Sequence, residues 1–453
     1  MDNSEVARYL AQDAEPEAAF AERFEGSFGH AIEVPAYGET ESLFETLRST
    51  PEGPLGEVLI VVVLNARDDS PEEIHEANRI ARERIAAAAS ASQVVSGSPD
   101  ARLATVERGK LLLIDRAVPG HYLPAGQGVG LARKIGCDLI LRLHEAGRLV
   151  SPWIHATDAD ARLPRDYFDQ IGNADAERTA AALYFFEHRF PEEEDLARAG
   201  RLYEISLRYY TLGLAWAGSP YAYQSMGSCL AIPPAAYARA GGFPRKNAIE
   251  DFTILNELAK IGSIERLAGT PVELEGRLST RVPVSTGQAL TSLVATRGEA
   301  FRLHHPIVFA HLAAWLRVLG AIARRGGDLE APLEELPRRN PFFRADLLQE
   351  ALGEMGAFEV VREAVAQSAG EEWLLRRLHA WFDAFRTRKL VEYLRDAGLT
   401  SLPYREALSE APFTGLSSSA EDDLEILRSV LVEEERKLAV APAGVPALEP
   451  ERA

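Results

Sequence analysis

Two aspartates separated by one small residue, Asp158 and Asp160 around Ala159, are the side chains in this sequence best suited to metal chemistry. They closely follow the apolar pair Trp153 and Ile154, so we expect them where a strand gives way to a loop. Mg²⁺ and Mn²⁺ prefer oxygen ligands, are usually held by one or two carboxylates, and complete their shells with water and a substrate diphosphate. The triplet alone is also a common turn sequence, because Asp is frequent in turns. The metal hypothesis therefore depends on what surrounds the triplet.

A second acidic pair, Glu250 and Asp251, lies where a helix is predicted to begin, since Ile254, Leu258 and Ile261 recur at helical spacing. The helix dipole favours an acid in the first turn, so capping is one interpretation of Asp251. The other is catalytic: with Glu250 beside it, Asp251 would act as general base for a hydroxyl nucleophile.

The glycine-rich stretch Gly126–Gly130 precedes a predicted helix that carries Arg133 and Lys134. A dinucleotide-binding loop would directly follow a strand, whereas residues 121–125 contain a proline and do not have a strand pattern, so we do not expect NAD binding. Two interpretations remain. Either Arg133 and Lys134 face solvent, or the loop amides and Arg133 hold the phosphates of a nucleotide.

Buried strands alternate with helices in the first two thirds of the sequence. Residues 58–64 are a continuous apolar run rich in valine, as a strand covered on both faces requires, and further strands are predicted from Ala31 and over 111–115. This alternation predicts a mostly parallel α/β sheet flanked by helices, with ligands beyond the carboxyl ends of its strands. Glu39, the acids at 68–69 and the Asp158–Asp160 triplet all fall at such ends.

Composition limits the functional classes. The 453 residues include 49 Lys and Arg against 68 Asp and Glu, a formal net charge of −19, which argues against nucleic-acid binding because phosphate backbones need a basic face. Cys137 and Cys229 form no metal or disulfide pattern and are expected to be buried free thiols in a reducing compartment. The acidic N-terminus does not resemble a signal peptide, so a cytoplasmic location is expected.

The sequence after about Gln288 is predicted to be helical. The apolar run 306–323 carries His311 and Arg317, so we expect a buried helix rather than a membrane span, and attachment to a membrane surface stays open. The expected parts of the chain are an N-terminal helical segment (1–29), an α/β domain (30–288), a helical C-terminal domain (289–438) and a disordered tail (439–453).

Five motifs, taken in chain order, resemble those of family 2 glycosyltransferases with a GT-A fold, and the resemblance covers roughly residues 31–288. The motifs are VPAYGE at 34–39, GVGLARKIGCD at 128–138, TDAD at 157–160, GGFP at 241–244 and IED at 249–251. The resemblance implies a GT-A nucleotide-diphospho-sugar transferase fold, a UDP- or GDP-linked sugar donor and Mg²⁺ or Mn²⁺. The implied site comprises Pro35, Tyr37 and Glu39 at the nucleotide, Asp158 at the ribose or metal, Asp160 on the metal, and Asp251 as the base. To these, the residue types considered above add Arg133 as a candidate nucleotide-binding residue and Glu250 as a candidate catalytic residue.

The sequence departs from that family in two places. The turn at 65–69 lacks the usual Asp-rich pattern that holds the base, and the Gln-x-x-Arg-Trp element of processive synthases is missing at 288–292. We therefore predict a single-addition, inverting transferase, with Arg281 either near the diphosphate or on a surface loop. A retaining transferase and a catalytically silent sugar-nucleotide binder remain as alternatives. The acceptor (saccharide, small molecule or lipid-linked) and self-association stay open.

The histidines near the acidic motifs and in the C-terminal part are expected to be structural rather than to bind a metal. His155 is expected to point to the face opposite Asp158 and to be structural. His304, His305 and His311 are weaker candidates for a third metal ligand than for surface or core positions.

Overall fold

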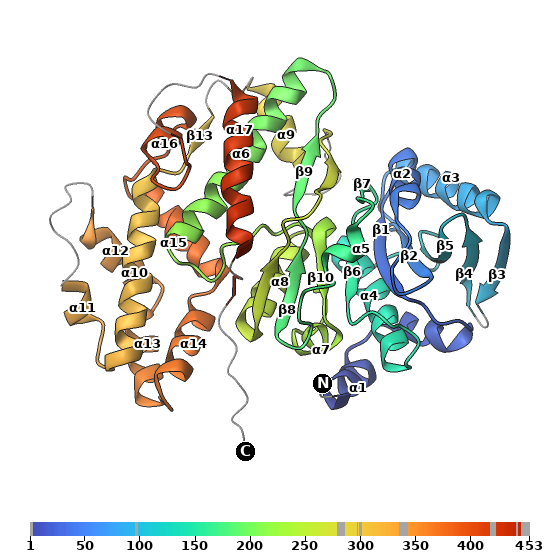
Figure 1. Ribbon diagram of the computed structural model, residues 1–453, viewed down its shortest axis with the longest axis horizontal. Helices are drawn as coiled ribbons and strands as arrows, with labels where there is room; N and C mark the ends of the chain where they lie inside the picture. The colour runs from blue at the N-terminus through green and yellow to red at the C-terminus, as the bar shows by residue number, and fades with distance from the viewer. Residues whose placement is uncertain are drawn as a thin grey trace. The chain divides into compact units, whose positions relative to one another are not determined.

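The computed structural model describes residues 3–95, 98–278, 286–296, 298, 301–334, 343–416, 423–440 and 443–444. The chain forms two compact units (Figure 1). Unit 1 comprises Met1–Pro191, Ser225–Leu258 and Ile264–Ala289, and unit 2 comprises Glu192–Gln224, Ala259–Ser263 and Leu290–Ala453.

Unit 1 is built on a nine-stranded sheet whose four central strands are parallel. They run in the order β6 (Ile154–Ala156), β1 (His30–Ala36), β2 (Val58–Asn65) and β5 (Gly109–Arg116). Every residue of β1 and β2 is buried, which agrees with the continuous apolar run in β2 and with a sheet covered on both faces. The predicted architecture, an α/β sheet flanked by helices and followed by a helical extension, is confirmed.

Further strands, most of them paired antiparallel, extend this parallel core in both directions. Next to β6 come β10 (Leu230–Ile232), β8 (Thr179–Leu183) and β11 (Ser263–Arg266), and next to β5 come β4 (Ser98–Val106) and β3 (Ala91–Val95). The strands β3 and β4 were not predicted, because their sequence is rich in small and polar residues. Most of β3 is exposed, so it did not need the apolar residues that mark a strand.

Helices cover the sheet of unit 1, and α4 (Val129–Glu145) is the most deeply buried of them. It packs on β1, β2 and β6 and on the N-terminal η1 (Pro16–Arg23), and α1 (Asn3–Gln12) packs against α4 and α7 (Pro234–Arg239). The other helices of this unit are α2 (Glu41–Ser49), α3 (Glu72–Ala88), α5 (Tyr167–Gln170), η2 (Gly227–Cys229) and α8 (Glu250–Ile261), whose last residues are assigned to unit 2.

A small second sheet in unit 1 joins β7 (Ala161–Arg162), β12 (Val272–Glu275) and β9 (Phe186–Arg189). Strand β12 pairs antiparallel with β7 and parallel with β9. Because β7 begins directly after Asp160, this sheet fixes the backbone next to the Asp158–Asp160 triplet. Cys137 and Cys229 are free and buried, as predicted.

Unit 2 is helical and has one apolar core. The long helices α6 (Glu194–Trp216) and α10 (Pro306–Arg325) contribute Leu202, Tyr209, Trp315 and Leu319 to it. The remaining elements are α9 (Thr286–Ala295, which begins in unit 1), β13 (Arg302–Leu303), α11 (Glu330–Glu334), α12 (Ala345–Glu354), α13 (Ala357–Ala366), α14 (Glu371–Trp381), α15 (Ala384–Asp396), β14 (Leu402–Pro403), α16 (Tyr404–Glu410), α17 (Leu424–Lys437) and η3 (Leu438–Val440).

The last boundary between the two units, after Ala289, lies within one residue of the expected position. The expected division is nevertheless incomplete, because Glu192–Gln224 and Ala259–Ser263 also belong to the helical unit although they interrupt the α/β unit in the sequence. The reason is that α6 packs against α10 and α17, which come much later in the chain. In the described part of the chain, α10 is the one helix long and apolar enough to cross a membrane, and 67% of its most apolar window is buried. Most of the tail expected to be disordered, 439–453, lies outside the described residues.

Candidate active site

The acidic triplet lies at the carboxyl edge of the parallel strands, where the sequence predicted it. Strands β1 and β6 are parallel neighbours, so Glu39 after β1 and the two aspartates after β6 share this edge. The turn is fixed by a hydrogen bond of 2.7 Å from Thr46 Oγ1 to the carbonyl of Ala161. The side chains of Asp158 and Asp160 keep 35% and 29% of their surface exposed, so both are accessible to a ligand.

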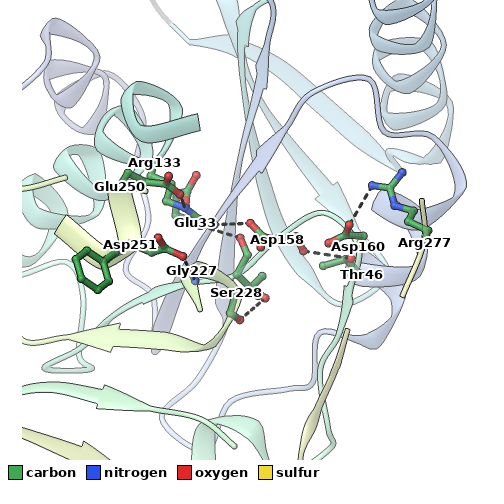
Figure 2. A network of polar contacts seen from close by, with 12 residues as sticks. Glu33, Thr46, Arg133, Asp158, Asp160, Gly227, Ser228, Glu250, Asp251 and Arg277 are labelled. Atoms are coloured by element: carbon green, nitrogen blue, oxygen red, sulfur yellow. Dashed lines mark hydrogen bonds and ion pairs between the residues drawn. The ribbon is translucent and has the colours of Figure 1, made fainter. Parts of the chain in front are cut away.

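A buried arginine connects Asp158 to two other acids. Arg133 on α4 is 1% exposed and lies beside Glu33, Asp158 and Glu250, which together form what we call the Arg133 cluster (Figure 2). Its Nε donates to Glu250 Oε1 at 3.1 Å, and its Nη1 donates to the carbonyl of Thr157 at 3.2 Å. Its Nη1 is 3.5 Å from Glu33 Oε2, and its Nη2 donates to Asp158 Oδ1. The guanidinium therefore fixes the relative positions of acids from β1, from the turn after β6 and from α8.

Glycines make room for this cluster. A Cβ on Gly227 would come within 2.5 Å of Arg133 Nη2, and a Cβ on Gly136 would come within 2.3 Å of Glu33 Cγ. A larger residue at either position would displace a charged side chain from its partners. Small residues at these two positions are therefore needed for Arg133 and Glu33 to be buried together.

The expectation that Arg133 and Lys134 face solvent is wrong, since both are buried. Lys134 is 4% exposed, and its Nζ lies 3.0 Å from Asp138 Oδ2. The reason is that α4 has apolar or small residues on all sides, and such a helix is buried with its charged residues included. The contacts of Arg133 are with carboxylates, so it positions acids in this conformation and its expected contact with phosphates remains a prediction.

Glu33 is the most buried acid of the cluster, at 0% exposed. Burial raises the pKa of Glu33 to about 8, even though the Arg133 guanidinium opposes the shift. One positive charge cannot balance three buried or half-buried carboxylates, so we expect Glu33 to hold a proton near neutral pH. Sequence reasoning missed Glu33, although an acid in the middle of an apolar strand was a usable signal.

Asp251 lies at the start of α8, as predicted, and is held from two sides. Its Oδ2 accepts the backbone N–H of Gly227 at 3.1 Å, and its Oδ1 accepts that of Phe252 at 2.7 Å. Burial and the charge of neighbouring Glu250 raise the pKa of Asp251 to about 7. A carboxylate with this pKa is well suited to exchange a proton near neutral pH.

The backbone just before these two acids is strained. Ile249 has φ of +57°, and no other non-glycine residue among those described has a positive φ. A β-branched residue in this region is unusual, because its Cβ crowds the backbone. Its carbonyl accepts from the Oγ1 of Thr253 at 2.7 Å, within the first turn of α8. This conformation directs Glu250 toward Arg133 while Asp251 reaches Gly227.

On the other side of Asp158, Asp160 is paired with a second arginine that sequence reasoning missed. Arg277 Nη2 lies 3.0 Å from Asp160 Oδ2 (Figure 2). The same nitrogen also donates to Glu39 Oε1. We call these three residues the Arg277 bridge. Burial and the charge of Asp158 raise the pKa of Asp160 to about 6, and Arg277 opposes this. The candidate Arg281, four residues later, lies outside the described residues.

The remaining predicted residues have the following positions. Pro35 is buried inside β1, and Tyr37 follows that strand with its hydroxyl 3.1 Å from Ser70 Oγ. His155 is buried against the rings of His30 and Phe168, as expected of a structural residue.

The three histidines considered as a third metal ligand all have contacts within unit 2. His305 accepts from the N–H of Ile307 and caps α10, and His311 lies 2.7 Å from the Ile307 carbonyl. The ring of His304 packs near Tyr210. These contacts account for all three as structural residues of the helical unit.

The donor set fits a hard divalent cation that shares its shell with a substrate. Among the described residues, no three His, Cys, Asp or Glu side chains converge so as to hold a metal by themselves. Asp158 and Asp160 offer carboxylate oxygens at an accessible edge, and Mg²⁺ commonly takes one or two carboxylates together with water and phosphate oxygens. The residues present therefore fit a cation that binds together with a diphosphate.

Comparisons with known proteins add limited information. No family model and no curated protein matches this chain. Similar solved structures include the mannosyltransferase PcManGT from Pyrobaculum calidifontis in complex with GDP-Man and Mn²⁺. The two sequences are 16% identical, the match covers 96% of this chain and 92% of that chain, and the TM-score is 0.32. S. aureus TarS 1-349, alone and with UDP-GlcNAc, has 12% and 13% identity, with 75% of this chain and 92% of that chain covered and a TM-score of 0.32. These scores are too low to establish a shared fold.

Proposed function

We propose that this chain is a metal-dependent inverting glycosyltransferase that moves one sugar from a nucleotide-diphosphate donor to an acceptor hydroxyl. The observation that carries the proposal is the polar network of unit 1. In it, Asp251, a carboxylate with a pKa of about 7, lies at the start of α8 beside Glu250, and Arg133 joins Glu250 to Asp158 of the acidic triplet. Such an enzyme needs a base for the acceptor and an acidic site for the donor, and this network contains carboxylates suited to each role.

The nucleotide is assigned to the end of β1, where Pro35, Tyr37 and Glu39 precede α2. Asp158 and Asp160 would hold Mg²⁺ or Mn²⁺ together with the donor diphosphate. A divalent cation bound there would neutralise the charge that develops on the departing diphosphate.

In the proposed reaction, the Asp251 carboxylate takes the proton of the acceptor hydroxyl. The hydroxyl oxygen then bonds to the anomeric carbon, and the bond from that carbon to the diphosphate oxygen breaks with its electron pair on the diphosphate. Attack from the face opposite the leaving group inverts the configuration. Arg133 and Glu250 act by positioning Asp158 and the start of α8.

The test is calorimetric titration of UDP, GDP and their common sugar conjugates, with and without Mn²⁺. We expect one nucleotide to bind in a metal-dependent way to the wild type and to Asp175→Ala, which removes an exposed turn aspartate outside the site. We expect that binding to be lost in Asp160→Ala. Absence of nucleotide binding under all conditions would refute the proposal, and the anomeric configuration of the product decides between inversion and retention.

A further inference from the structure

Arg277 forms an ion pair with Asp160, the carboxylate assigned to the proposed metal. Its Nη2 lies 3.0 Å from Asp160 Oδ2 and donates to Glu39 Oε1, and its Nε lies 3.5 Å from a carboxylate oxygen of Glu275. The Arg277 side chain is 30% exposed, while Glu39 is almost buried. An arginine in contact with three acids is permanently charged, so it acts at Asp160 as a built-in cation.

The backbone determines this placement. Strand β12 pairs antiparallel with β7, with Glu273 opposite Arg162 and Leu274 opposite Ala161. The N–H of Glu275 then donates to the carbonyl of Asp160 at 3.3 Å, directly beside the triplet. Arg277 follows two residues further on, and its N–H donates to the carbonyl of Glu275 at 3.2 Å.

Gly276 adds to this constraint. Its N–H donates to the carbonyl of Arg189 at 2.9 Å, and a Cβ at this position would come within 2.6 Å of the Phe190 ring. The chain therefore passes close to β9 just before Arg277, which brings the guanidinium to the edge of the sheet where Glu39 and Asp160 lie.

Each aspartate of the triplet contacts a different arginine. Asp158 is bound through Oδ1 to Arg133, and Asp160 is bound through Oδ2 to Arg277. Among the described residues, Asp158 Oδ2 and Asp160 Oδ1 have no hydrogen-bond or ion-pair partner. Arg133 is buried inside unit 1, whereas Arg277 is partly exposed and can move without unfolding its surroundings.

We propose that Arg277 is the resident counter-ion of the metal site: its guanidinium holds Asp160 in the nucleotide-free protein and leaves that carboxylate when a divalent cation binds. This inference rests on the proposed function. The displaced guanidinium remains near the site through its own backbone and takes an oxygen of the incoming diphosphate as its new partner. The metal alone must break the Asp160–Arg277 pair, whereas the metal arriving with a nucleotide brings the replacement partner. Metal binding without nucleotide is consequently weak, and the two ligands bind cooperatively.

The experiment measures Mn²⁺ binding by the loss of the free Mn²⁺ electron paramagnetic resonance signal, with and without the nucleotide that calorimetry identifies. The protein is used as the full chain in four forms: wild type, Arg277→Met, Arg277→Lys and Arg162→Met. Arg162 is a matched control, because it lies on the adjacent strand β7, is exposed and is paired with Glu273 rather than with the triplet. Circular dichroism establishes that each variant is folded.

We expect Arg277→Met to bind Mn²⁺ alone roughly tenfold more tightly than the wild type does, within the range of ordinary coupling between two ligands. Arg162→Met should match the wild type, and Arg277→Lys, which keeps the charge but loses the planar fork, should lie between them. The factor by which nucleotide raises the Mn²⁺ affinity should be smaller in Arg277→Met than in the wild type, because this variant has no guanidinium to displace from Asp160.

Two results would overturn the inference, and they differ in what they say about the proposed function. Equal Mn²⁺ affinity in wild type and Arg277→Met, with metal-dependent nucleotide binding intact, removes the counter-ion role and leaves the transferase proposal standing. Absence of Mn²⁺ binding in every form, with nucleotide as well as without, refutes the metal assignment and the counter-ion role together.

Discussion

The buried carboxyl of Glu33 should make the stability of unit 1 fall as pH rises through neutrality. The pKa of Glu33 is raised from 4.5 to about 8, so the folded state holds this proton more tightly than the unfolded chain does. The stabilisation is present in full below pH 4.5 and is lost progressively as pH rises to about 8. Each pH unit inside that window removes up to about 1.4 kcal/mol, so between about pH 6 and pH 8 the loss from this one group is roughly 2 kcal/mol.

Replacing Glu33 by Gln isolates this contribution. The amide has nearly the shape of the protonated carboxyl and cannot ionise, so the stability of Glu33→Gln relative to the wild type should rise by about 2 kcal/mol between about pH 6 and pH 8. Asp160 and Asp251 titrate in the same direction, and the comparison at each pH cancels them to first order. The exposed Glu83→Gln on α3 removes the same charge from the surface and should show no such difference.

The assay is urea unfolding followed by circular dichroism at several pH values, with the two units fitted as separate transitions because a two-unit chain need not unfold in one step. The reasoning would be refuted if Glu33→Gln were less stable than the wild type by the same amount at every pH. That result would mean that Glu33 is ionised and that its ion pair with Arg133 outweighs the cost of burial.

Three further predictions concern the same network. Asp251→Asn should lower turnover by about 10²- to 10⁴-fold and remove the rise in rate with pH near 7, while calorimetry finds the nucleotide affinity unchanged. If the rate of the variant still rises with pH near 7, another residue is the base. Gly227→Ala should destabilise unit 1 and weaken nucleotide binding, because its Cβ would lie 2.5 Å from Arg133 Nη2; thermal unfolding matching that of the wild type would contradict this contact. Ile249→Asn should raise the unfolding free energy by about 1 kcal/mol in urea titrations, since Asn tolerates positive φ better than a β-branched residue does. A loss of stability would show that the packing of the Ile249 side chain contributes more free energy than its backbone strain costs.

The sequence predicted the central strands of the sheet well, because their apolar residues are continuous. In contrast, β3 and β4 were missed. Strand β3 lies at an exposed edge of the sheet and needs no apolar run, and β4 beside it is rich in small and polar residues. The assignment of α6 to the helical unit could not be predicted, because it depends on contacts with helices about 100 to 200 residues later in the chain. Local patterns carry no information about such pairings.

The acidic residues of the candidate site could be predicted, because their types and spacing indicate a chemical role. The Asp158–Asp160 triplet and the Glu250–Asp251 pair were identified from their spacing and from the elements before them. The pairing of these acids with Arg133 and Arg277 could not be predicted, since each pair joins residues more than 20 positions apart along the chain. The sequence therefore indicated which groups could act, and only the structure shows which charges neutralise one another.

The discontinuous composition of unit 2 has a consequence for how this chain is synthesised. Helix α6 leaves the ribosome with a fully buried residue, Arg208, whose carboxylate partner Glu435 is translated more than 200 residues later. Until α10 and α17 emerge, Leu202, Ile205 and Tyr209 lack the helices against which α6 packs in the folded chain. The ion pair of Arg208 with Glu204, in contrast, joins two residues of α6 itself. A chain truncated before α17 would retain every residue of the candidate active site, yet its α6 would lack one of the helices against which it packs. Chaperones that bind nascent chains would therefore be expected to act on α6.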